Sequence, residues 1–82
     1  MNIYVANISF RATENQLKDL FQQFGEVTSV KIVKDRETGR SRGFGFIEMA
    51  NDAEGQQAIA QLNGNSFQDR NLVVNEARPP KQ

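Results

Sequence analysis

The pattern of apolar and polar positions predicts four β-strands along the chain. In residues 2–7 and 71–77, apolar and polar side chains alternate. Residues 27–34 are rich in β-branched side chains, and residues 43–49 place Gly, Ile and Met at every second position. These patterns are typical of strands, because successive side chains of a strand point to opposite faces. Gly39 lies in a turn sequence and is expected to have a positive φ, which would join 27–34 to 43–49 as a hairpin.

Two helices are predicted between these strands. Thr13 and, three residues later, Gln16 form a capping-box signature, so we expect the first helix to begin here. The apolar residues of 17–24 then recur at the spacing of one buried helix face, and Gly25 ends the pattern. A second helix is expected over 51–62, capped by the Asn or Asp at its start.

The order of these elements predicts the fold class. Each helix has a single apolar stripe, so in a chain of 82 residues both helices must cover the same face of one sheet. We expect an α+β, ferredoxin-like βαββαβ sandwich, with a four-stranded antiparallel sheet and two helices packed on one face. One domain is expected over 1–78, followed by a short tail at 79–82. The second face of the sheet is left open.

Aromatic residues are predicted on this open face. Phe44, Phe46 and Glu48 share one face of their strand, while Ile47 and Met49 share the other. A core does not normally take an unpaired carboxylate, so the face with Glu48 should be the open one. By the same alternation the open face carries Tyr4, Lys31, Val33, Phe44, Phe46, Glu48 and Asn75. Aromatic rings on an uncovered sheet, rimmed by basic side chains, are typical of a platform for unpaired bases.

Composition narrows the function classes. The chain has no Cys and no His, which excludes disulfides, thiolate or imidazole metal sites, and Ser–His–Asp or Cys–His catalysis. We therefore expect no enzyme, no metal and no cofactor. The start lacks a basic segment followed by a long apolar run, so we expect a soluble, cytoplasmic protein with no membrane partner.

Charge is balanced over the whole chain but uneven along it. The formal net charge is zero. Between residues 31 and 42 five basic residues outnumber two acidic ones, whereas 43–69 contains no Lys or Arg. The zero net charge alone argues against a strong nucleic-acid binder, but the uneven distribution predicts a molecule that is basic on one side and acidic on another. Scattered, solvated surface charge is the alternative.

Two short motifs resemble those of the RNA recognition motif family. Residues 42–49, RGFGFIEM, are similar to the family's octamer, with Ile47 in place of valine and Met49 in place of a final aromatic residue. Residues 3–8, IYVANI, resemble its hexamer. The resemblance covers essentially the whole chain, and it extends to stand-alone bacterial RNA-binding proteins with a single motif.

The resemblance implies single-stranded RNA as the partner and assigns roles by position. Tyr4 and Phe44 would stack on two successive bases, Phe46 would pack against a ribose, and Arg42 would meet a phosphate. Arg40 would meet phosphates from the hairpin, and further polar contacts would come from Asn7, Lys31, Asn75 and Arg78. Single-stranded DNA is a second candidate ligand, and we expect a monomer that acts in post-transcriptional regulation or as an RNA chaperone.

Alternatives remain open at this point. The same fold could serve as a protein-interaction module, in which the sheet aromatics or the acidic second helix dock a peptide. Separately, Phe44 and Phe46 could be covered by the chain after Arg78 or by another protein, and Tyr4 could be an ordinary surface tyrosine. Arg40 and Arg42 could serve only to solubilise the hairpin, and Asn7 could be a turn residue at the end of a strand. Acylphosphatase chemistry on this scaffold would need Arg11 and Asn15 in a phosphate-binding loop, but the glycine-rich cradle is missing from the sequence.

Overall fold

The computed structural model describes residues 1–77. Its elements, in chain order, are β1 (Asn2–Ala6), α1 (Glu14–Gln22), β2 (Val27–Lys34), β3 (Ser41–Met49), α2 (Asp52–Leu62), β4 (Ser66–Phe67), β5 (Arg70–Asn71) and β6 (Val73–Ala77). The predicted contact residue Arg78 and the predicted tail at 79–82 lie outside the described residues.

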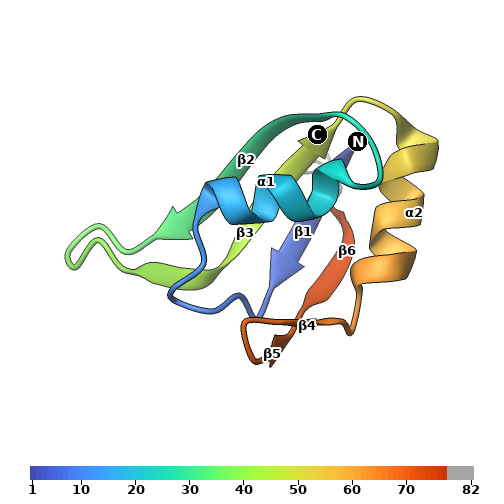
Figure 1. The fold of residues 1–82 in the computed structure, drawn as a ribbon. Helices are drawn as coiled ribbons and strands as arrows, with labels where there is room; N and C mark the ends of the chain where they lie inside the picture. Colours follow the sequence, from blue (N-terminus) through green and yellow to red (C-terminus); the bar gives the residue numbers. More distant parts are fainter. Residues whose placement is uncertain (78–82) are drawn as a thin grey trace.

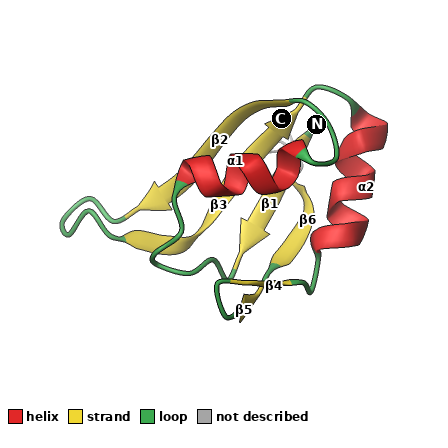
Figure 2. Cartoon of the chain, in the orientation of Figure 1, coloured by secondary structure: helices red, strands yellow, loops and turns green. Residues whose placement is uncertain are grey.

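The main sheet has the strand order β2-β3-β1-β6, and every neighbouring pair is antiparallel. Both helices lie on the same side of this sheet (Figures 1 and 2). The two motif-bearing strands, β1 and β3, are therefore adjacent at its centre. The ferredoxin-like βαββαβ fold predicted from the sequence is confirmed.

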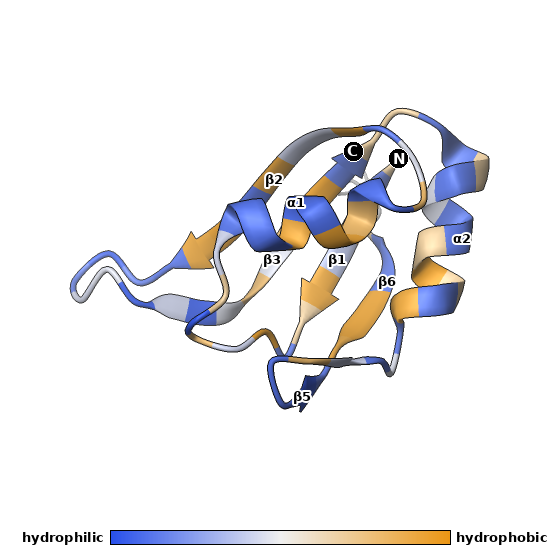
Figure 3. Ribbon diagram, in the orientation of Figure 1, coloured by the Kyte–Doolittle hydropathy of each residue, from blue (hydrophilic) through white to orange (hydrophobic). Residues whose placement is uncertain are grey.

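The core lies between the sheet and the helices. Ile47 and Met49 are buried, as the alternation along β3 predicted, and Leu17 and Phe21 meet them from α1. Figure 3 shows hydrophobic residues along the strands beneath the helices and a polar tip on the β2–β3 hairpin. The whole core cluster consists of Ile3, Val5, Ile8, Ala12, Leu17, Phe21, Val27, Ile32, Ile47, Met49, Ala58, Leu62, Leu72 and Val74.

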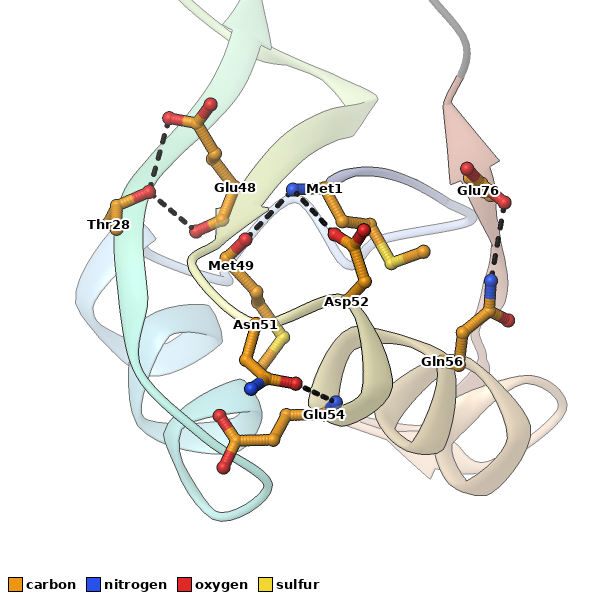
Figure 4. Close-up of polar contacts among 9 residues, drawn as sticks. All are labelled: Met1, Thr28, Glu48, Met49, Asn51, Asp52, Glu54, Gln56 and Glu76. Carbon is orange, nitrogen blue, oxygen red and sulfur yellow. Dashed lines mark hydrogen bonds and ion pairs between the residues drawn. The ribbon is translucent and has the colours of Figure 1, made fainter.

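Both helices begin where their caps predict. The hydroxyl of Thr13 accepts a hydrogen bond from the Gln16 N–H, and the Gln16 side chain accepts one from the Thr13 N–H, which completes the capping box of α1. Asn51 caps α2 by accepting from the Glu54 N–H at 3.0 Å (Figure 4). These bonds satisfy backbone donors that the first turn of a helix leaves without partners.

Strand boundaries differ from the prediction in three places. The first strand ends at Ala6 because Asn7 has a φ of 58°. The third strand begins earlier, at Ser41. The last strand begins at Val73 rather than at residue 71, because β5 pairs with β4 in a small separate hairpin. Gln68 and Asp69, at the turn of that hairpin, both have positive φ, and the turn lacks the glycine that gives the strongest hairpin signal in a sequence.

Gly45 allows β2 and β3 to approach closely. It is buried opposite Ile32, and a β-carbon at this position would collide with the backbone carbonyl of Lys31. The register between β2 and β3 also shifts between Ile32, which pairs with Gly45, and Lys34, which pairs with Ser41. Gly39, at the hairpin tip, has the predicted positive φ of 73°.

At each edge of the main sheet, a side chain accepts a hydrogen bond from one backbone N–H of the edge strand. On β2, the Ile32 N–H donates to Oε2 of Glu14, at the start of α1, over 3.0 Å. On β6, the Val74 N–H donates to Oδ1 of Asn63, at the end of α2, also over 3.0 Å. Each helix is thereby tied to the edge strand beside it.

Candidate nucleic-acid interface

Four residues form a row across the open face, one from each strand of the main sheet. Lys31 pairs with Phe46, Phe46 with Tyr4, and Tyr4 with Asn75. Direct partners in antiparallel strands point to the same face. Their sequence neighbours Ile3, Val5 and Ile47 are buried under the helices, so the row lies on the opposite side, the far side in Figure 1.

The three aromatic rings form one cluster on this face. The ring centroids of Tyr4 and Phe46 lie 5.7 Å apart, those of Tyr4 and Phe44 6.0 Å, and those of Phe44 and Phe46 6.4 Å. The interplanar angles are 54°, 42° and 89°, so the rings do not stack in parallel on one another. Phe46 is 41% exposed, and Tyr4 and Phe44 are partly exposed. The structure thus brings together the three rings predicted from the sequence.

Basic side chains lie beside this cluster. Lys31 is the cross-strand partner of Phe46, and Arg42 lines a hollow together with Tyr4 and Phe44. Arg40 is exposed but lines a different hollow, between the β1–α1 loop and the β2–β3 hairpin, so its contact with RNA stays a prediction. The amino group of Met1 forms an ion pair with Asp52 (Figure 4). Within residues 1–77 no Lys or Arg side chain forms an ion pair with a carboxylate. Their charge is thus available to an anionic ligand.

Asn7 is held within the protein. Its Nδ2 donates to the carbonyl of Asn71 over 2.7 Å, and its Oδ1 accepts from Nη1 of Arg70 over 3.1 Å. With its positive φ, these bonds give Asn7 a structural role at the end of β1. Its contact with RNA stays a prediction, as do those of Lys31 and Asn75.

Sequence reasoning missed two residues at the end of the sheet. Phe10, in the connection from β1 to α1, is 66% exposed, and Cζ of Arg70 lies 5.4 Å from its ring centroid. Both side chains line a hollow of about 300 Å³ that also includes Tyr4, Phe44 and Arg42. Phe10 follows the first predicted strand and belongs to neither the strand alternation nor the apolar stripe of the helix. The only signal in the sequence was therefore a bulky aromatic residue in a polar loop.

Other kinds of site find no support in the described residues. No group of three or more Asp, Glu, His or Cys within 1–77 is placed to hold a metal ion. None of the helices in that range is long and apolar enough to cross a membrane.

Comparison with known proteins identifies the family. The RNA recognition motif model matches residues 3–73. The chain is 52% identical over 79 residues to the Nostoc protein named "Putative RNA-binding protein RbpD", covering 96% of this chain and 84% of the relative. It is 51% identical over 75 residues to the chloroplastic 31 kDa ribonucleoprotein of Nicotiana sylvestris, covering 92% of this chain and 24% of that protein.

Solved structures agree with the sequence comparison. The crystal structure of RNA binding protein PG1 superposes with a TM-score of 0.94 at 49% identity, covering 100% of this chain and 99% of that one. The Rna15 RRM with bound RNA (GU) superposes with a TM-score of 0.85 at 32% identity, covering 95% and 83%. The adjacent β1 and β3 motifs, the open aromatic face and these matches lead to one conclusion: the chain belongs to the RNA recognition motif family.

Proposed function

We propose that this protein binds single-stranded RNA across the open face of its sheet, without catalysis. The observation that carries the proposal is the cluster of Tyr4, Phe44 and Phe46 on the side of the sheet that the helices do not cover. Membership of the RNA recognition motif family supports it, as do relatives named for RNA binding and a structural neighbour solved with RNA.

In the proposed mechanism the aromatic rings stack on bases and ribose, and the basic side chains bind phosphates. Two successive bases stack on Tyr4 and Phe44, a ribose packs against Phe46, and Arg42 meets a phosphate. Each stacked base contributes about 1–3 kcal/mol to binding, so the rings account for most of the affinity. Lys31 and Asn75 lie at the two ends of the same row, where they can donate to base edges or to the backbone.

The wider role follows from this binding. We propose that the protein acts as a monomer in the cytoplasm, in post-transcriptional regulation or as a chaperone of RNA structure. Single-stranded DNA is proposed as a second ligand, because stacking does not distinguish the sugars, whereas contacts to the 2′-hydroxyl would.

An amide NMR titration with a pool of short, random single-stranded RNA tests the proposal. Binding on the sheet predicts shifts concentrated at Tyr4, Lys31, Phe44, Phe46 and Asn75. Shifts confined to α2, or no shifts on the sheet, would contradict it and favour a protein-interaction module instead. The same titration with single-stranded DNA of matched length measures the preference between the sugars.

A further inference from the structure

Phe10 is an exposed aromatic residue that lies outside the hydrophobic core cluster. Among residues 1–77 the large hydrophobic side chains that are exposed are Phe10, Phe46 and Val73. Phe46 and Val73 lie on the open face of the sheet, since they pair with Tyr4 and Ala6 of β1. Phe10, at 66% the most exposed of the three, lies in the loop at the end of the same strand.

Hydrogen bonds hold the surroundings of this ring in place. Arg70 donates to Asn7, and Asn7 donates to the carbonyl of Asn71, so the β4–β5 hairpin is fixed to the end of β1. The Ile8 N–H donates to the carbonyl of Gly43 over 2.8 Å, which fixes the start of the loop to β3. Figure 1 shows the loop and the β4–β5 hairpin side by side at this end of the sheet. The guanidinium of Arg70 is thereby positioned near the ring of Phe10.

The hollow between Phe10 and the sheet has the chemistry of a nucleotide site. Its volume of about 300 Å³ is at the lower end of the range for small-ligand sites. Three aromatic rings (Tyr4, Phe10 and Phe44) and two arginines (Arg42 and Arg70) line it, with no carboxylate. Rings beside guanidinium groups suit a base that carries a phosphate.

The other side of Phe10 is also basic. There the ring lines a second hollow, of about 810 Å³, between the β1–α1 loop and the β2–β3 hairpin. Its charged lining residues are Arg11, Lys34 and Arg40 against the single carboxylate of Glu14. Positive charge on both sides of an exposed ring disfavours an apolar protein surface as the partner, and an aromatic ring between cations suits an anionic strand whose bases can stack.

We propose that Phe10 and Arg70 form an additional nucleotide-binding position at the rim of the sheet, next to the nucleotide stacked on Phe44. The inference rests on the proposed function, because the same RNA strand continues from the sheet into this position. Phe10 supplies a stacking surface and Arg70 a cation for the phosphate. The binding site is then at least one nucleotide longer than the sheet alone provides.

Affinity as a function of RNA length tests this proposal. Random-sequence RNA pools from dinucleotides to octanucleotides are titrated against the wild-type protein, Phe10→Leu, Phe10→Tyr and Phe44→Ala. Leucine keeps an apolar side chain at position 10 but cannot stack on a base, whereas tyrosine keeps the aromatic ring. In the wild type, one added nucleotide should increase affinity by about fivefold or more, the lower end of the contribution of a stacked base.

The expected result is that Phe10→Leu abolishes this step and leaves the affinity for the shortest binding pool unchanged, while Phe10→Tyr retains the step. Retention of the step in Phe10→Leu would overturn the proposal. So would an equal loss at every length together with a lower melting temperature, since that pattern means a structural role.

The proposed function fails in a different way. If the wild type binds no pool, or if Phe44→Ala leaves the affinity for the shortest pools unchanged, sheet binding itself is wrong and the inference is overturned with it. If Phe44→Ala weakens binding to the shortest pools and Phe10→Leu has no effect at any length, the function stands and only the additional position is refuted.

Discussion

Tyr4 on β1 and Phe46 on β3 are direct cross-strand partners, and their ring centroids lie 5.7 Å apart on the face that the helices leave open. Their neighbours along the strands, Val5 and Ile47, are buried in the core. The ring pair is therefore carried by two strands whose opposite face is packed in the core. A binding surface held in this way needs little ordering when a ligand arrives, which reduces the entropic cost of binding.

Removal of two rings should weaken RNA binding without unfolding the domain. For Phe44→Ala combined with Phe46→Ala we expect at least tenfold weaker binding, since one stacked base contributes about 1–3 kcal/mol. Fluorescence anisotropy with labelled RNA measures the affinity, and circular dichroism checks the fold. Gln57→Ala, exposed on α2, is the matched control and should bind as the wild type does. Unchanged affinity in a folded double variant would refute the stacking platform.

Salt should affect binding only moderately. Each phosphate contact on a single strand contributes ~0.7 to the magnitude of the slope of log K against log salt. With about three to four basic contacts the slope should be about −2 to −3. Arg42→Gln should reduce the magnitude of this slope by ~0.7, the contribution of one phosphate. Lys18→Gln, exposed on α1, removes the same charge from the helix layer and should not change the slope. Equal slopes for Arg42→Gln and the wild type would mean that Arg42 does not contact a phosphate.

Two glycines in or near the hairpin should differ in their tolerance of alanine. At Gly45 the added methyl group meets the backbone of Lys31, so we expect a loss of about 2 kcal/mol or more in the free energy of unfolding. At Gly39 no heavy atom lies within 4 Å of the added carbon, and only the positive φ opposes it. The net loss there should be no more than about 1 kcal/mol, because alanine also restricts the unfolded chain. Urea unfolding compares the two variants, and equal losses would contradict the close approach of β2 and β3.

The bond from Ile32 to Glu14 should contribute measurably to stability. Glu14→Ala leaves the Ile32 N–H without this acceptor and should cost about 1.5 kcal/mol, whereas Glu14→Gln retains a neutral acceptor and should cost less. Hydrogen exchange at the Ile32 amide should be faster in the alanine variant. Asn15→Ala, in the same helical turn, is the control. An unchanged exchange rate in Glu14→Ala would show that the bond is not formed in solution.

Much of this structure could be predicted from the sequence, because local chemistry decides it. The capping box at Thr13 and the positive φ of Gly39 depend on residues within a few positions, and the alternation of buried and exposed side chains follows from strand geometry. The hairpin around residues 68–69 was missed because its turn contains neither Gly nor Asn. Phe10 was missed because its partner, Arg70, lies 60 positions away and is brought near only by the completed sheet.

The hydrogen bonds at the two edge strands have a further consequence for association between copies of the chain. A sheet with exposed aromatic residues is at risk of adding strands from other molecules, and such addition begins at unpaired backbone donors along an edge. Here Glu14 already occupies the Ile32 N–H on one edge, and Asn63 occupies the Val74 N–H on the other. On each edge strand, one backbone donor that a strand from another molecule would use is thus already bonded within the protein, while the aromatic face of the sheet stays open.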